Sequence, residues 1–157
     1  MILRRFYPTL DQLAVIDAKL KDGYLYLPDE YREDVARQFF MAVVFNPETS
    51  EHYEIGDFGG IVSFYDILPG YKCGAMMKIW DKKYWGSTVV REAREAIESL
   101  MSRYNLSRVS IEGADDKLVR IGEMLGMENE GVRFKSFMWD GKLYPVYMMA
   151  KVREAEV

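Results

Sequence analysis

The stretch of sequence that decides the fold is residues 81–104, DKKYWGSTVVREAREAIESLMSRY. From Ser87 to Tyr104 the apolar residues recur every three or four positions and the charged residues lie between them; the apolar set is Val89, Val90, Ala93, Ile97, Leu100, Met101 and Tyr104. This spacing predicts an amphipathic α-helix over 87–104. The residues before it, which end at Gly86, predict a loop that leads directly into the helix.

The residues before this stretch favour strands in the middle of the chain and helices nearer its start. Three segments rich in β-branched and aromatic residues predict an antiparallel meander over His52–Ile55, Gly60–Leu68 and Tyr71–Trp80. The turns Gly56–Gly60 and Pro69–Gly70 separate these segments. Upstream, the pattern predicts a strand over Met1–Tyr7, a helix from the capping box Thr9–Gln12 to Asp22–Gly23, and a second helix from Pro28 to Asn46.

The residues after this stretch alternate between strand and helix patterns. They predict a buried strand, a helix capped by Asp115 or Asp116 that ends at Gly126, and two long closing strands. The three strands are expected over Arg108–Glu112, Gly131–Met138 and Lys142–Val152. Asp140-Gly141 supplies the positive φ angles of a hairpin turn between the last two. The sequence therefore predicts the α+β class.

Composition excludes several classes of protein. The length of 157 residues predicts one domain over 1–157. The 25 acidic and 21 basic side chains give a net charge of −4, which argues against general nucleic-acid binding. No stretch has the ~20 apolar residues of a membrane-spanning helix, so we expect no membrane partner and a cytoplasmic location. The single Cys73 and single His52 exclude an intramolecular disulfide and argue against a metal site. His52 follows Glu51 at a polar strand start and is expected to be exposed.

Five short segments carry a resemblance to a known family. They are Asp81–Gly86, Leu106–Val109, Ile121–Met127, Glu130–Arg133 and Trp139–Gly141. These segments, and the order of the predicted elements, resemble the GNAT acyltransferase superfamily, in the branch that acetylates protein N-termini and aminoglycosides. The resemblance covers about residues 54–152. It implies a GNAT-like mixed, mainly antiparallel twisted sheet of about seven strands with about four helices.

The resemblance also implies a cofactor, acetyl-CoA, and no metal. Family members bind the pyrophosphate on backbone N–H groups at the start of the long helix, where the helix dipole favours an anion. The cofactor-binding residues implied in this chain are Met77, Ile79, Trp85, Gly86, Ser87, Thr88, Val89 and Asp115. The chain departs from the family's glycine or alanine at Thr88 and Val90, where a β-branched side chain could shield those N–H groups. Whether CoA binding survives stays open.

Three further positions depart from the family pattern. Asp115 stands where the family often has an asparagine that reaches the pantetheine arm, and Leu118 stands where it has serine or alanine. Gly122 stands where many members have a tyrosine that protonates the leaving thiolate. Because a glycine has no proton to donate, the acid would have to come from another residue.

The reaction that the resemblance implies is direct attack of an amine on the thioester. It needs a main-chain N–H for the oxyanion, expected near Met77 or Ile79, and a base for the amine. The candidate catalytic residues are the bases Glu112 and Asp81 and the acid Tyr144. Further candidates are Glu54 as a base and Tyr84 and Tyr147 as acids. Each of them also fits a residue with a purely structural place at a strand end or turn. The lysines 72, 78, 82 and 83 could meet the 3′-phosphate of CoA or form a solvated edge.

Two functions from different classes follow from these features. The first is an enzyme, an acetyl-CoA-dependent N-acyltransferase whose acceptor is an amine on a protein, peptide or small molecule. The second is a catalytically inactive GNAT-fold protein that acts through protein contacts, for example in bacteriophage head assembly or as an internal virion protein. Small phage-encoded GNAT-like proteins are similar in length, eroded glycines and aromatic final strands. Under either function a homodimer seam or a virion-protein contact could use Tyr144, Tyr147, Met148 and Met149.

Overall fold

The computed structural model describes residues 1–21, 38 and 40–153 and contains one seven-stranded sheet. The elements in chain order are β1 (Leu3–Phe6), α1 (Leu10–Lys21), the π-helical turn η1 (Phe40–Val44), β2 (Glu51–Ile55), β3 (Gly60–Leu68), β4 (Lys72–Ile79), the 3₁₀ turn η2 (Lys82–Tyr84), α3 (Ser87–Tyr104), β5 (Arg108–Gly113), α4 (Lys117–Met124), β6 (Glu128–Trp139) and β7 (Lys142–Val152). The strand order is β1-β2-β3-β4-β5-β7-β6. The neighbours β4 and β5 run parallel, and the other neighbours run antiparallel. The α+β class and the mixed, mainly antiparallel sheet are confirmed.

Most of the predicted elements lie where the sequence pattern placed them. The helix over 87–104 is confirmed at both ends, and Thr9 and Gln12 form the expected capping box, each main-chain N–H donating to the other's side chain. The closing hairpin turns through Asp140 and Gly141 with positive φ angles. The second predicted helix lies for the most part outside the described residues.

The largest error in a predicted strand boundary is at the start of β6. β6 begins at Glu128, three residues before the predicted start at Gly131. Gly131 has a φ of 120° and sits at a register shift between Asn129 and Gly131. Because glycine tolerates this conformation, the strand continues through a bulge instead of starting after it.

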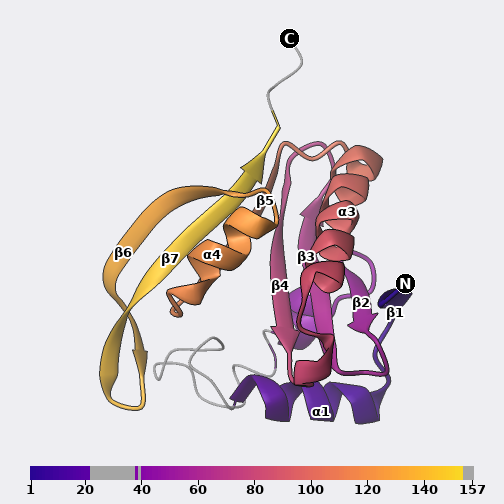
Figure 1. Cartoon of the computed structure of the whole chain (residues 1–157), viewed down its shortest axis with the longest axis horizontal. Helices are drawn as coiled ribbons and strands as arrows, with labels where there is room; N and C mark the ends of the chain where they lie inside the picture. The colour runs from indigo at the N-terminus through magenta and orange to yellow at the C-terminus, as the bar shows by residue number, and fades with distance from the viewer. Residues whose placement is uncertain (22–37, 39, 154–157) are drawn as a thin grey trace.

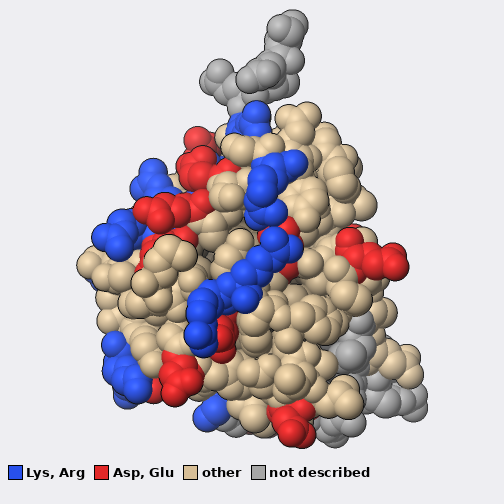
Figure 2. Space-filling view, turned by 90° about the vertical axis from the view of Figure 1, so that its right-hand side faces the viewer, with Lys and Arg blue, Asp and Glu red and all other residues tan. Residues whose placement is uncertain are grey.

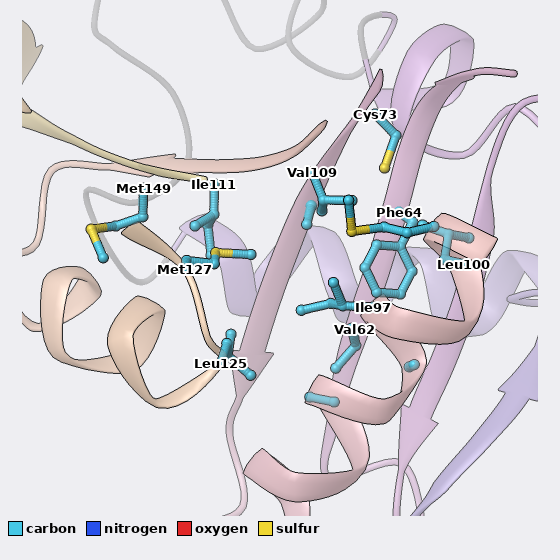
Figure 3. Close-up of a cluster of buried hydrophobic side chains, with 14 of the residues drawn as sticks. Val62, Phe64, Cys73, Ile97, Leu100, Val109, Ile111, Leu125, Met127 and Met149 are labelled. Atoms are coloured by element: carbon cyan, nitrogen blue, oxygen red, sulfur yellow. The ribbon is translucent and has the colours of Figure 1, made fainter. Parts of the chain in front are cut away.

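Helical segments pack on both faces of the sheet. Figure 1 shows α3 and α4 over one face and α1 across the lower end. On one face, α3 and α4 pack over a large cluster of buried side chains, part of which is drawn in Figure 3; it includes Phe64, Val109, Ile97, Leu100, Ile111, Leu125 and Met149. On the other face, a smaller cluster joins α1 and η1 to the sheet through Ile16, Val44, Phe45 and Ile61. Alternation along each strand therefore divides the apolar residues between two cores.

The sheet opens between its two central strands. β4 and β5 pair at three positions, from Lys72↔Arg108 to Gly74↔Ser110. β4 then continues to Ile79 and β5 to Gly113 without pairing to each other. In Figure 1 the β1–β4 half and the β5–β7–β6 half separate below the top of the sheet. This opening leaves one edge of each strand free in the centre of the fold.

Two buried carboxylates, Glu51 on β2 and Glu92 on α3, fasten α3 to the first strands of the sheet. Glu51 is 3% exposed and binds both terminal nitrogens of Arg103 at 2.7 and 2.8 Å, while Tyr104 Oη donates to it at 2.8 Å. Burial alone would raise the pKa of Glu51, but the hydrogen bonds and the positive charges of Arg103 and Arg5 lower it below its ordinary value. Glu92 on α3 accepts the N–H of Ile2 at 2.9 and 3.0 Å. These contacts fasten α3 to β1 and β2.

His52 is buried, so the expectation that it is exposed was wrong. Its side chain is 1% exposed and stacks on Phe45, with ring centroids 4.7 Å apart. Both ring nitrogens have hydroxyl partners, Ser63 Oγ at 2.8 Å and Ser50 Oγ at 2.9 Å. Burial lowers the pKa of His52 to about 4, and the nearby Glu51 opposes this only in part. A second ring, that of Tyr7 from a distant part of the chain, meets the His52 ring edge-on at 5.7 Å.

We expect this histidine to make the protein sensitive to mild acid. The folded pKa lies below the unfolded value of 6.5, so the unfolded chain takes up a proton first and the free energy of unfolding falls as the pH drops from 6.5 toward 4. From about pH 7.5 to about pH 5 the loss should be about 2 kcal/mol. Urea unfolding at the two pH values measures it. His52→Gln, which keeps a hydrogen-bonding side chain, should lose this pH dependence; an unchanged slope in the variant would contradict the assignment.

The packing of α4 on β7 gives a second prediction. A Cβ added at Gly122 would lie 2.8 Å from Met149 Cγ and Cε and 3.0 Å from its Cβ, too close for an ordinary contact. Gly122→Ala should therefore destabilise the protein by about 1–3 kcal/mol. Without the obstruction, the same change in a helix would stabilise by up to about 1 kcal/mol. Gly86→Ala is the control, since nothing lies within 4 Å of its added Cβ. A higher melting temperature for Gly122→Ala would contradict this prediction, because it would mean that the Met149 side chain moves aside without destabilising the fold.

Candidate functional site

A cavity of about 210 Å³ lies where β4 and β5 separate. It is lined from β4, β5, the segment before α3, and the start of α4, by Met77, Lys78, Ile79, Trp85, Ile111, Asp115, Lys117, Leu118 and Ile121. Five of these side chains are aliphatic or thioether, so most of the wall is apolar. The charged lining residues are Lys78 on β4, Asp115 just before α4, and Lys117, the first residue of α4. Four residues that the resemblance implied for the cofactor, Met77, Ile79, Trp85 and Asp115, come together here.

The unpaired edge of β4 presents main-chain groups to this cavity. The N–H of Trp80 donates to the carbonyl of Gly59 at 2.9 Å, so at this position the backbone of β4 faces β3. N–H groups alternate in direction along a strand, and the register pairs Gly60 with Ile79 and Val62 with Met77. The N–H groups of Met77 and Ile79 therefore face away from β3, toward the side from which β5 has separated. Two main-chain donors thus lie at the cavity wall.

The start of α3 is a second group of main-chain donors. Gly86 is its N-cap and makes no side-chain capping hydrogen bond, and the first bond of the helix runs from the N–H of Val90 to the carbonyl of Gly86 at 3.5 Å. In an α-helix the N–H groups before that bond have no acceptor within the helix. Those of Ser87, Thr88 and Val89 are therefore available to an anion, and the helix dipole favours one there.

The β-branched residues of this segment point in different directions. Val90 is 8% exposed and Val89 is fully buried, and both belong to the core under α3. Ser87 and Thr88 are exposed. The side chain of Val90 is therefore directed into the core and not across the exposed start of the helix, and only Thr88 remains of the two side chains expected to shield the N–H groups.

The candidate catalytic residues lie outside the lining of the cavity. Glu112 follows the cavity residue Ile111, so its side chain is on the opposite face of the sheet, where Arg133 binds it at 2.7 Å. Asp81 accepts the N–H of Lys83 at 3.1 Å and caps η2. Tyr144 is opposite Phe137 in the β6–β7 hairpin. The structure does not bring these three together, and their catalytic roles stay predictions.

The secondary candidates have structural partners. Tyr84 Oη accepts the N–H of Asp57 at 2.9 Å, and Glu54 forms an ion pair with Arg4 at 2.5 Å. Tyr147 is opposite Gly113 and packs against the core under α4. Of the four lysines considered, Lys78 lines the cavity.

Sequence reasoning missed Ile111, Lys117 and Ile121 as cavity residues. Lys117 is the first residue of α4, and its N–H donates to Asp115 Oδ1 at 2.9 Å. Asp115 and Asp116 correctly indicated where the helix begins. Nothing in the spacing indicated that this first turn would lie beside β4, because that proximity depends on how far the two strands separate.

The remaining chemistry of the described residues is limited. Burial raises the pKa of the Cys73 thiol to about 12, so it stays protonated at neutral pH. In the described ranges, no group of three or more His, Cys, Asp or Glu side chains is arranged to hold a metal ion. Among the helices that the structure describes, none combines the length and apolar character that a membrane crossing requires.

Comparison with known proteins relates the chain to acetyltransferases by structure. The sequence matches no family model and no curated protein. Spermidine N-acetyltransferase from Vibrio cholerae, solved with CoA and spermine, superimposes with a TM-score of 0.72 at 16% identity, over 96% of this chain and 95% of that one. A GNAT-family acetyltransferase from Bacillus anthracis gives 0.67 at 14% identity, over 97% and 95%. The microcin C7 self-immunity acetyltransferase MccE, solved with acetyl-CoA and AMP, gives 0.67 at 15%, over 96% and 92%.

These similarities extend over nearly the full length of both chains in each pair. At 14–16% identity they establish the arrangement of the backbone and leave the chemistry to be argued from the site. They give no support to a resemblance to bacteriophage proteins. The chain has the fold of the GNAT-family acetyltransferases.

Proposed function

We propose that the protein is an acetyl-CoA-dependent N-acyltransferase. The observation that carries the proposal is the cavity between β4 and β5, which has the N–H groups of Met77 and Ile79 on one wall and reaches the uncapped start of α3 through Trp85. Solved structures of the same fold were obtained with CoA and spermine and with acetyl-CoA and AMP, which supports a CoA thioester donor and an amine acceptor.

The residues present fit the parts of this cofactor. The apolar wall formed by Ile111, Leu118 and Ile121 suits the pantetheine chain. The N–H groups of Ser87, Thr88 and Val89 would hold the pyrophosphate. Asp115 keeps one carboxylate oxygen on the N–H of Lys117, and the positive charges of Lys78 and Lys117 on the same cavity offset its charge toward an anionic ligand.

The strand edge supplies the electrostatic part of the catalysis. A main-chain donor at Met77 or Ile79 would bind the thioester oxygen, and its hydrogen bond strengthens as negative charge develops there. The candidate bases remain Asp81 and Glu112, although the side chain of Glu112 lies on the other face of the sheet with Arg133. With Gly122 packed against Met149, the residue that protonates the thiolate must come from elsewhere, and Tyr144 remains the candidate acid.

The acceptor, the location and the assembly are finer parts of the proposal. The acceptor is an amine on a protein, peptide or small molecule, and the location is cytoplasmic. A homodimer through the last strands stays a prediction, and Met149 is unavailable to it because it is fully buried under α4. The alternative of an inactive protein in a phage particle gains no support from the neighbours. Acetyl transfer to a panel that includes a polyamine, an aminoglycoside and a peptide N-terminus separates the two functions.

Binding of the cofactor should stabilise the folded state. At a hundredfold excess of acetyl-CoA over Kd, the free energy of unfolding should rise by about 2.7 kcal/mol. A thermal-shift titration measures this as a rise in Tm that depends on cofactor concentration. If millimolar acetyl-CoA leaves Tm unchanged, the proposed function is wrong.

A negative charge at the start of α3 should weaken binding without harming the fold. Thr88→Asp places a carboxylate on an exposed position of the first turn, where it stabilises the helix dipole but repels the phosphates. We expect CoA affinity to fall about tenfold while the melting temperature is unchanged or higher. Ser136→Asp, an exposed position on β6, adds the same charge elsewhere and is the control. Equal affinity of Thr88→Asp and wild type for CoA would place the phosphates at another part of the molecule.

A further inference from the structure

We propose that Tyr84 and the β2–β3 turn Gly56–Gly60 form a clamp that positions the phosphate-binding start of α3. Tyr84 is then a positioning residue for the cofactor and not the acid that the sequence suggested. This role rests on the proposed function. Neither Tyr84 nor the turn Gly56–Gly60 lines the cavity.

The first evidence is steric. The ring of Tyr84 occupies the space where both Gly56 and Gly59 would carry a Cβ atom, since a Cβ built at either position lies closer than 3.0 Å to ring atoms. Real Cβ atoms essentially never approach so closely, so a side chain at either glycine would displace the ring. Gly56 also has a φ of 57°, a conformation that favours glycine. The turn is shaped around this one aromatic ring.

The second evidence is a set of four hydrogen bonds that join the turn to residues 80–84. The N–H of Asp57 donates to Tyr84 Oη at 2.9 Å. The N–H groups of Trp80 and Asp81 both donate to the carbonyl of Gly59, at 2.9 and 3.0 Å. The indole of Trp80 donates to the carbonyl of Phe58 at 2.8 Å. The segment that leaves β4 is therefore held by the turn along its length.

This hold is passed on to α3 over a short distance. Within η2, the N–H of Tyr84 donates to the carbonyl of Asp81 at 3.1 Å, and the N–H of Trp85 donates to that of Lys82 at 3.1 Å. Only Trp85 and Gly86 separate Tyr84 from the first residue of the helix. Gly86 has open space around it and no side chain, so it does not fix the loop by itself. The position of the N–H groups at the start of α3 therefore depends on Tyr84.

The partner of the tyrosine hydroxyl argues against an acid role. Tyr84 Oη is bound to the main chain of the turn, and Tyr84 is not among the residues that line the cavity. The neighbouring Trp85 does line it, although its side chain is 47% exposed. A group that holds its neighbour in place affects cofactor affinity without touching the reacting atoms.

Two binding measurements on the full chain test the clamp. Isothermal titration calorimetry measures the affinity for CoA, and an NMR titration measures the affinity for pantetheine, which has no phosphate. We expect Tyr84→Ala to weaken CoA binding about tenfold or more, because the donors at α3 lose their fixed position. Tyr84→Phe keeps the ring and loses the hydrogen bond from Asp57, so it should weaken CoA binding about threefold. Pantetheine, which lacks the phosphates, should bind these variants and the wild type equally.

Two further variants distinguish positioning from general packing. Tyr104→Phe removes a hydroxyl bonded to Glu51 at the other end of α3; it should lower the melting temperature and leave CoA affinity unchanged. Gly59→Ala keeps Tyr84 but displaces its ring, so it should weaken CoA binding like Tyr84→Ala. If Tyr84→Ala does not fold, Tyr84→Phe and Gly59→Ala give the answer.

The outcomes separate this inference from the function on which it rests. If the wild type binds CoA and the folded Tyr84 and Gly59 variants bind it equally well, the clamp is wrong and the proposed function stands. If the variants lose affinity for CoA and pantetheine alike, the tyrosine acts on the whole cavity and the positioning role is wrong. If the wild type itself does not bind CoA, the proposed function fails and the inference falls with it.

Discussion

The early end of the pairing between β4 and β5 is the constraint on which the rest of the structure depends. After Gly74 and Ser110 the two central strands separate, although each continues for several residues. An unpaired strand edge inside a protein leaves main-chain donors that need partners. The fold therefore leaves the donors of Met77 and Ile79 at a cavity in the centre of the sheet, where a ligand can supply the missing acceptor.

Two helices on one face of the sheet hold its halves on either side of the opening, and α3 contacts both halves. In the first half, Glu92 and Glu51 bind α3 to β1 and β2 through buried hydrogen bonds. In the second half, Gly122 lets α4 approach β7 until it contacts Met149. Charged residues of both signs lie side by side on the surface over the first half, as Figure 2 shows, so no field of one sign dominates that face. The cavity therefore lies between two halves of the sheet that share one hydrophobic core.

The sequence predicted what depends on local periodicity and missed what depends on distant contacts. The helix over 87–104, the capping box and the hairpin turn follow from patterns within a few residues, and all are confirmed. The burial of His52 could not be read from its own strand, because Phe45 and the distant Tyr7 cover it. The resemblance named Met77, Ile79, Trp85 and Asp115, which do lie on one cavity. The position of Lys117 on the cavity wall depends on how far β4 and β5 separate, which no short motif encodes.

A crystal structure of the protein with acetyl-CoA tests the central claim most directly. We predict that the thioester lies between β4 and β5 with its oxygen within hydrogen-bond distance of the N–H of Met77 or Ile79, and that the pyrophosphate lies on the N–H groups of Ser87–Val89. Cofactor bound elsewhere on the molecule, or a cavity closed by renewed pairing of β4 with β5, would contradict the account.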